Sequence, residues 1–318
     1  MKITYIILYN LQIPQTIPIY YTNAKQGPNI LCLHGAGHSG LSFSELAHIA
    51  SKYRVISYDF RGHGYNTSTP GTELSLKNMI SDTEKVLVKI SQLFPKDTII
   101  ILGHSFGGAI AIKTTCNILS TETYPDLYEK IQGLIVLDVV EGSAMEALPF
   151  MMSIVQNRKN NFTTINEAIE YMHSTQIRNL HSVRVSIPPL LKEEKDEKGN
   201  KVFKWKTDLV SSEQYWKEWY ENMSNCFLSV KVPKMLLITD ASTLDTPLTI
   251  AHMQGKFKLN VIKGTGHFVM EDDPKEVNVQ IEEFLNAFRI VKTVDEIKHI
   301  IGKNGEKMKI CKYAKFSG

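Results

Sequence analysis

The feature that most constrains the fold is the segment TIIILGHSFGGAIAIKTT at residues 98–115, in which a run of β-branched residues leads directly into a glycine-flanked serine. The apolar run before the serine predicts a buried strand, and the residues after it predict a helix. The motif between them matches G-x-S-x-G, a turn that presents a serine hydroxyl above a sheet at the start of a helix. Such a turn strains the serine backbone and leaves little room for flanking side chains. The segment therefore predicts a nucleophilic Ser105 rather than a serine in a small-residue packing site.

Short apolar runs alternate with helix-like segments along most of the chain. We predict further buried strands within residues 29–37, 53–64, 131–140, 232–240 and 258–268. Continuous apolar strands separated by helices are typical of a mostly parallel sheet with helices on both faces, the α/β class. The last helix is predicted to begin at Pro274 with Asp273 as its N-cap, and the main domain is expected to span residues 1–290.

Two segments interrupt this alternation. Residues 139–232 contain helix-like pieces but no clear strand of the sheet, so we predict a helical lid insertion at about 142–231, with a flexible charged loop at about 192–201. Residues 291–318 are rich in lysine and are predicted to form a basic, solvated, helical tail. The tail contains IIGKNGEKMKI, which is similar to the GxxG loop of a KH nucleic-acid module, but it is too short for that module.

Composition excludes several classes of protein. The chain is 43% hydrophobic and 22% charged, as in soluble globular proteins, and its net charge of +3 is too small to indicate a nucleic-acid partner. The four cysteines are scattered without a CxxC pair, which is typical of a reduced intracellular chain without a zinc site. No apolar run is long enough for a signal peptide or a membrane helix. We expect a monomeric cytoplasmic or nuclear protein that contacts neither membrane nor nucleic acid and uses no metal or cofactor.

A serine hydroxyl becomes a good nucleophile only when a base takes its proton. His267 follows the last predicted strand in GTGHF, just before the final helix, where a serine–acid–histidine chain order places the base. Four other histidines adjoin the serine or belong to glycine loops, and we expect them to pack those loops: His34, His38, His63 and His104.

The acid that orients the histidine is expected at a strand end. Asp138 ends the apolar run GLIVLD, whereas Asp240 and Asp245 follow KMLLIT. Asp240 falls close to the strand itself and Asp245 far along the loop, so neither position suits the role as well. We prefer Asp138, because a buried carboxylate at the tip of an apolar strand needs a hydrogen-bonded partner, which a triad histidine supplies.

The loop HGAGHSG follows the first predicted core strand and offers backbone donors for a developing negative charge. We expect the N–H group of Ala36 or Gly37 to form an oxyanion hole together with that of Phe106. The alternative is a plain tight turn with no part in chemistry.

Several segments together resemble one branch of the α/β hydrolases, the protein phosphatase methylesterases, from about residue 17 to residue 290. The motifs that carry the resemblance are GHSFGGAIA, GLIVLDVVEGSAMEAL, QIRNLHSVRVSIP, YWKEWYENMSNCFLSVKVPKMLLIT, LTIAHMQGKFKL and GHFVMEDDP. The resemblance implies an esterase that removes the methyl ester from the C-terminal leucine carboxylate of the protein phosphatase 2A catalytic subunit. It also implies that Asp138 is the triad acid and that the lid shapes a groove for the phosphatase tail.

The resemblance further implies contacts with the phosphatase at Glu141, Met253 and Gln254, although a core role for Met253 fits the sequence equally well. Two residues depart from the family pattern. Ala36 stands where the family tends to have glycine, and Phe106 replaces the usual methionine beside the nucleophile, where it is expected to narrow the acyl pocket. The basic tail at 291–318 has no counterpart in the pattern.

Two other functions are compatible with the same residues. One is a generic carboxylesterase that hydrolyses small esters and differs only in what the lid admits. The other is a non-catalytic protein that binds the phosphatase, which the intact serine, histidine and acid disfavour.

Overall fold

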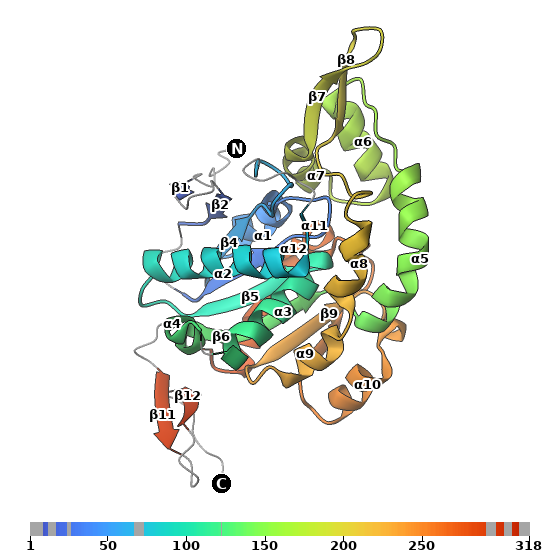
Figure 1. Ribbon diagram of the computed structural model, residues 1–318. Coiled ribbons are helices and arrows are strands. Elements are labelled where there is room, and N and C mark those ends of the chain that lie inside the picture. The colour runs from blue at the N-terminus through green and yellow to red at the C-terminus, as the bar shows by residue number, and fades with distance from the viewer. Residues whose placement is uncertain are drawn as a thin grey trace.

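The computed structural model describes residues 9–11, 17–23, 27–66, 73–121, 123–290, 297–301 and 307–311. Its centre is a sheet with the strand order β1-β2-β4-β3-β5-β6-β9-β10, covered by helices on both faces (Figure 1). The strands are β1 (Tyr9–Leu11), β2 (Ile17–Tyr21), β3 (Asn29–Leu33), β4 (Arg54–Tyr58), β5 (Ile99–His104), β6 (Ile131–Leu137), β9 (Lys234–Ile238) and β10 (Lys258–Val261). Among these described strands only the pairs that involve β2 are antiparallel, so the predicted α/β class with a mostly parallel sheet is confirmed.

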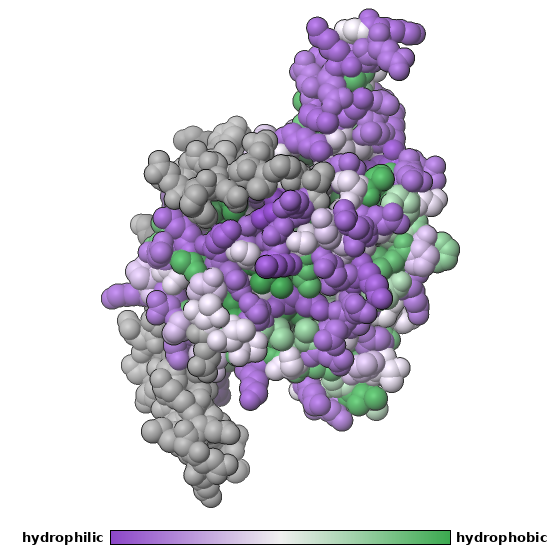
Figure 2. Space-filling model, viewed as in Figure 1, coloured by the Kyte–Doolittle hydropathy of each residue, from purple (hydrophilic) through white to green (hydrophobic). Residues whose placement is uncertain are grey.

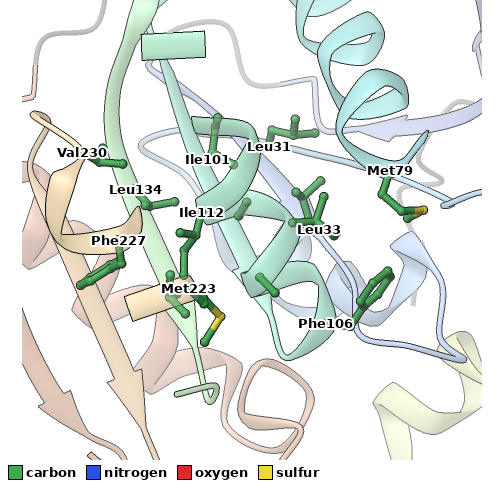
Figure 3. Close-up of a cluster of buried hydrophobic side chains, with 14 of the residues drawn as sticks. Leu31, Leu33, Met79, Ile101, Phe106, Ile112, Leu134, Met223, Phe227 and Val230 are labelled. Atoms are coloured by element: carbon green, nitrogen blue, oxygen red, sulfur yellow. The ribbon is translucent and has the colours of Figure 1, made fainter. Parts of the chain in front are cut away.

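Side chains of the central strands point alternately into two separate cores, as the two-residue period of a strand requires. In β5, Ile99 and Ile101 face one core, whereas Ile100 and Leu102 face the other. Helices α2 (Leu76–Leu93), α3 (Phe106–Thr121), α4 (Pro125–Lys130), α8 (Glu213–Tyr220), α9 (Met223–Ser229) and α10 (Thr246–Met253) close the first core. Part of it, between α3, α9 and the sheet, is shown in Figure 3.

The second core lies under α1 (Ser44–Ile49), α6 (Ile165–Thr175), α7 (Leu180–Ser186), α11 (Val269–Asp272) and α12 (Pro274–Ala287). Helix α12 begins as predicted, because the Asp273 side chain accepts a hydrogen bond from the backbone N–H of Glu276 at 3.0 Å. Short 3₁₀ turns η1 (Gly40–Phe43), η2 (Pro188–Leu190) and η3 (Ala241–Thr243) connect the remaining elements.

The segment between β6 and β9 contains the long helix α5 (Glu141–Asn157), followed by α6 to α9. Helix α5 runs along one edge of the molecule (Figure 1), and none of its residues is buried. Hydrophobic residues gather along the same edge (Figure 2), where Phe150 and Ile154 are 69% and 63% exposed.

The charged run expected as a loop at 192–201 instead contributes to a hairpin. Strands β7 (Leu191–Lys195) and β8 (Lys201–Trp205) pair antiparallel and project from the body as a hydrophilic arm (Figures 1 and 2). Cross-strand ion pairs support it, with Lys201 on Glu193 and Lys204 on Glu194 at 2.7 and 3.1 Å. Opposite charges on facing strands favour pairing, which explains why this polar sequence forms strands.

The described parts of the C-terminal segment also differ from expectation. Strand β11 (Ile297–Ile301) pairs antiparallel with β12 (Lys307–Cys311), so the prediction of a helical tail is wrong for these residues. Apolar and polar residues alternate in KMKIC, a two-residue period that favours a strand. The two glycines of the GxxG sequence, at 302 and 305, lie outside the described residues.

Candidate active site

Ser105 alone forms the turn between β5 and α3. Its backbone adopts the left-handed conformation, with a φ of 53°, and its N–H donates to the carbonyl of Leu137 at 2.9 Å. A Cβ atom on Gly103 would lie 2.2 Å from the carbonyl oxygen of Gly107, and one on Gly107 would lie 2.3 Å from that of Leu33. The G-x-S-x-G spacing is therefore required by close backbone contacts, and the strain of about 1–2 kcal/mol at the serine is held by the packed sheet and helix.

Asp138 and His267 meet at the same edge of the sheet. His267 Nδ1 donates to Asp138 Oδ2 at 2.7 Å, while Oδ1 accepts hydrogen bonds from the backbone N–H and the hydroxyl of Thr239 at 2.8 and 2.9 Å. Burial opposes ionisation of Asp138, but the hydrogen bonds from His267 and Thr239 outweigh it and hold the pKa of the carboxyl below its ordinary value. The carboxylate thus stays charged and fixes the orientation of the imidazole.

Ser105, Asp138 and His267 all line one open cavity of about 1080 Å³. Within the described residues no hydrogen bond joins the Ser105 hydroxyl to His267, whose side chain is 47% exposed. Catalytic hydrogen bonds are commonly longer in free enzymes and shorten when substrate binds, so the arrangement is compatible with proton transfer from Ser105 to His267.

The two alternative acids are occupied elsewhere. The Asp240 carboxylate accepts from the N–H of Ser242 and caps η3. The Asp245 carboxylate caps α10 through the N–H of Leu248 and also accepts from the hydroxyl of Ser224 at 2.6 Å. Both carboxylates are therefore engaged in local structure, and Asp138 is the one that accepts the hydrogen bond from His267 Nδ1.

The structure separates the two candidate donors of the glycine loop. The N–H of Gly37 donates to His63 Nε2 at 3.0 Å, and His63 accepts there because its Nδ1 faces the carbonyl of Arg61. Ala36 lines the cavity, and Phe106 is the first residue of α3. In the described part of the chain no acceptor is found for the N–H of Ala36 or Phe106, which leaves these two as the pair able to bind an oxyanion.

The histidines that the sequence assigns to loop packing hold loops together. His34 Nε2 accepts from the N–H of Phe60, and His104 Nε2 donates to the carbonyl of His267 at 2.8 Å. Burial, and then the neighbouring charge of His267, lower the pKa of His104 to about 3, so it stays neutral. His38 is buried against Phe268, and burial likewise lowers its pKa.

The residues expected to contact a partner are not part of the described lining of the cavity that contains Ser105. Both carboxylate oxygens of Glu141 accept backbone N–H groups at the start of α9, from Asn222 and Ser224, each at 2.7 Å. Met253 ends α10 and is 82% exposed, so the core role considered for it is wrong. Gln254, the next residue, is also exposed. The described lining of the cavity includes none of the three.

The Phe106 side chain does not narrow the cavity, contrary to expectation. Its ring is fully buried and belongs to the first core (Figure 3). It packs on Trp219 and Phe60, with ring centroids 4.2 and 5.4 Å apart. The first helical residue after Ser105 therefore directs its side chain into the core, while its N–H is left without an acceptor among the described residues.

Two arginines of the cavity, Arg158 and Arg178, were not predicted, and Arg158 is the one beside the glycine loop. Arg158 follows α5 directly and lines the cavity opposite the glycine loop, where a Cβ on Gly37 would lie 3.4 Å from Arg158 Nη1. Its sequence surroundings, QNRKNN, resemble any polar loop. Only the fold brings it to the site, so no local signal marks it.

No helix in the described parts of the chain is long and apolar enough to cross a membrane. Across the same residues no three His, Cys, Asp or Glu side chains gather in a way that would hold a metal ion.

Comparisons with known proteins agree with this architecture. The sequence model of the Alpha/beta hydrolase family matches residues 30–280. Among solved structures, E-2-(acetamidomethylene)succinate hydrolase superposes with a TM-score of 0.71 at 18% identity, covering 89% of this chain and 100% of that one. An esterase from a marine microorganism superposes with a TM-score of 0.58 at 21% identity, covering 85% and 100%. The chain is thus an α/β hydrolase.

Sequence relatives narrow the class. A protein of Caenorhabditis elegans named probable protein phosphatase methylesterase 1 is 38% identical over 278 residues, which cover 85% of this chain and 72% of the relative. Protein phosphatase methylesterase 1 of Bos taurus is 34% identical, covering 86% and 81%, and that of Schizosaccharomyces pombe is 35% identical, covering 85% and 78%. The chain belongs to the protein phosphatase methylesterase family.

Proposed function

We propose that the chain is a serine carboxylesterase that hydrolyses the methyl ester on the C-terminal leucine of the protein phosphatase 2A catalytic subunit. The observation that carries the proposal is the 2.7 Å hydrogen bond between His267 and Asp138 in the cavity that also contains Ser105. The names of the relatives supply the substrate class.

In the first step His267 Nε2 takes the proton of the Ser105 hydroxyl as the oxygen attacks the ester carbonyl. The negative charge that develops on the carbonyl oxygen is stabilised by the N–H groups of Ala36 and Phe106, at the positive end of α3. Asp138 stabilises the imidazolium. When the tetrahedral intermediate collapses, the carbonyl re-forms, the bond to the methoxy group breaks, and His267 gives its proton to the departing methanol.

In the second step water attacks the acyl-enzyme. His267 takes a proton from the water, the bond between Ser105 Oγ and the acyl carbon breaks, and the serine recovers its proton from His267. The products are the free leucine carboxylate, methanol and unchanged enzyme.

The proposal includes residues 142–231 as the lid of the main domain, because α5 and the residues after it line the cavity on the side away from the sheet. It also includes Met253 and Gln254 as contacts with the body of the phosphatase, since both are exposed and lie outside the cavity. A monomeric enzyme in the cytoplasm or nucleus and a separate role for residues 291–318 stay predictions.

The proposal is tested by methanol release from carboxymethylated phosphatase 2A catalytic subunit, with a short-chain ester as counter-substrate. Ser105→Ala is expected to lose up to about 10⁶-fold in kcat, the loss seen when a triad serine is removed in a comparable hydrolase. Ser143→Ala is the matched control, because Ser143 lines the same cavity but its hydroxyl donates to the carbonyl of Val140.

The proposal is supported if methanol release from the protein substrate is lost in Ser105→Ala and kept in Ser143→Ala. Rapid turnover of the short ester with an untouched phosphatase would leave a generic carboxylesterase instead. Binding to the phosphatase without any turnover would indicate a non-catalytic binding protein.

A further inference from the structure

Arg158 carries a positive charge in the cavity wall without an acidic partner among the described residues. Its guanidinium stacks on the ring of Trp205, with Cζ 3.7 Å from the ring centroid, and its Nε is buried without a hydrogen-bond acceptor. No carboxylate of the described residues lies within 4.0 Å of it. Burial lowers the pKa of Arg158 to about 10, so the group is still charged at neutral pH. Arg158 as a whole is half-buried, but buried polar atoms such as its Nε almost always have a hydrogen-bond partner, so the unpaired guanidinium is suited to bind an anion from outside the chain.

The other charged residues of the cavity lead to the same conclusion, that Arg158 binds an anion from outside the chain. Arg178 lines it together with Arg158, whereas Asp138 is the only carboxylate of its described lining and is fully occupied by His267 and Thr239. Arg178 is exposed and donates to the carbonyl of Gly264, so it braces a loop. Arg158 is therefore the cation of the described cavity wall whose donors are open to a ligand.

The position of Arg158 sets what it can recognise. It lies against Gly37, one residue further along the loop than Ala36, whose N–H faces the ester carbonyl in the proposed mechanism. A group bound there belongs to the same peptide as the ester but lies away from the reacting carbon. The planar guanidinium matches a carboxylate, which it binds through two parallel hydrogen bonds.

We propose that Arg158 forms a subsite that binds the carboxylate of an acidic side chain in the peptide segment that carries the C-terminal ester. The inference rests on the proposed function and names the chemical class of its substrate: a C-terminal peptide with an acidic residue near its esterified end. Arg158 acts in specificity and positioning and takes no part in bond making.

Two alternative roles for Arg158 lead to different binding behaviour. If it binds the leucine carboxylate released by hydrolysis, its loss weakens binding of the product peptide only. If it serves only to pack Trp205 and the β7–β8 hairpin, its loss affects acidic and neutral peptides equally.

The test uses the full chain with Ser105→Ala, so that esters bind without turnover. Dye-labelled hexapeptides ending in leucine methyl ester carry one Asp at successive positions, each with an Asn twin, and a neutral peptide with a free C-terminal carboxylate is included. Fluorescence anisotropy gives Kd for the parent, for Arg158→Gln and for the control Lys159→Gln. Lys159 is the adjacent cation, but it pairs with Glu167 and does not line the cavity.

At the position that meets Arg158, the Asp peptide is expected to bind about 10- to 100-fold more tightly than its Asn twin, the range for hydrogen bonds to a charged group. Arg158→Gln should reduce this preference to less than twofold, while Lys159→Gln keeps it. Arg158→Lys, which keeps the charge and much of the stem, should retain part of it, and thermal melting of each variant confirms folding.

An acid preference that persists in Arg158→Gln overturns the proposal, as does an equal loss for both peptides or a loss confined to the product peptide. The outcome is separable from that of the proposed function. If the Ser105-containing chain hydrolyses no peptide ester but the Arg158-dependent preference is found, the esterase proposal fails and the subsite stands. If it hydrolyses acidic and neutral esters equally and Arg158→Gln has no effect, the subsite fails and the esterase stands.

Discussion

Asp138→Asn tests the acid of the site with little disturbance to the fold. Position 138 has a left-handed backbone with a φ of 51°, which asparagine tolerates as well as aspartate. Thr239 directs two donors at Oδ1, at 2.8 and 2.9 Å, so the amide oxygen of the variant takes that place. The amide NH₂ then faces His267 Nδ1, the atom that the native carboxylate accepts from at 2.7 Å.

The consequence is a change of tautomer. With a donor opposite Nδ1, the imidazole carries its proton on Nε2 and cannot accept the Ser105 proton. The same substitution in a comparable triad lowers kcat about 10⁴-fold. That factor corresponds to about 5.4 kcal/mol of lost transition-state stabilisation, at 1.36 kcal/mol for each factor of ten.

The assay is single-turnover methanol release from a C-terminal leucine methyl ester peptide at saturating enzyme. Asp245→Asn is the matched control, because the Asp245 carboxylate caps α10 instead of pairing with His267. We expect Asp245→Asn to stay within a few-fold of wild type. A loss of less than tenfold in Asp138→Asn, or an equal loss in Asp245→Asn, would refute the assignment of the acid.

Two further predictions concern stability. Burial raises the pKa of Glu271 to about 7 despite hydrogen bonds from Ser182 and Ser186, so the folded protein keeps a proton that the unfolded chain releases near pH 4.5. This contribution to the free energy of unfolding is complete below pH 4.5 and falls by about 1.4 kcal/mol per pH unit up to pH 7. Glu271→Gln should remove this pH dependence of the free energy of unfolding and be more stable than wild type at pH 8. Wild-type urea-unfolding curves that are the same across pH 5–8 would contradict the prediction. Ser105→Gly relieves the steric strain of the left-handed backbone at φ 53°. It should raise the free energy of unfolding by about 1 kcal/mol while abolishing hydrolysis. The matched Ser105→Ala keeps the strain and should not be stabilised in the same denaturant titration.

The parts of the site that the sequence predicted are those set by local rules. Ser105 sits between an apolar strand and a small-residue helix, and His267 comes after the last strand of the sheet, so chain order alone places them at one sheet edge. Asp138 was favoured because it ends an apolar strand, and the structure places it beside His267.

The parts that escaped prediction depend on contacts between distant segments. The N–H of Gly37 donates to His63, which is 26 residues away, so the loop sequence could not reveal that Ala36 is the open donor. The hairpin β7–β8 forms partly because Phe203 pairs with Phe162, a residue of a distant segment, which adds to the cross-strand ion pairs. Arg158 lies in an unremarkable polar stretch, and its importance follows from Gly37 and Trp205, which the fold brings to it.

The lack of buried residues in α5 has an evolutionary consequence. Substitutions in β5 or α3 create cavities or overpack the core, whereas α5 lines the cavity without contributing a fully buried side chain. Ile154 and Asn157, near the end of α5, line the cavity but are exposed, so changes there alter its shape and polarity at little cost to folding. Selection can adapt this end of α5 to new substrates while Ser105, Asp138 and His267 stay fixed at the edge of the sheet, so divergence within the family is expected to concentrate after the shared GSAMEAL sequence.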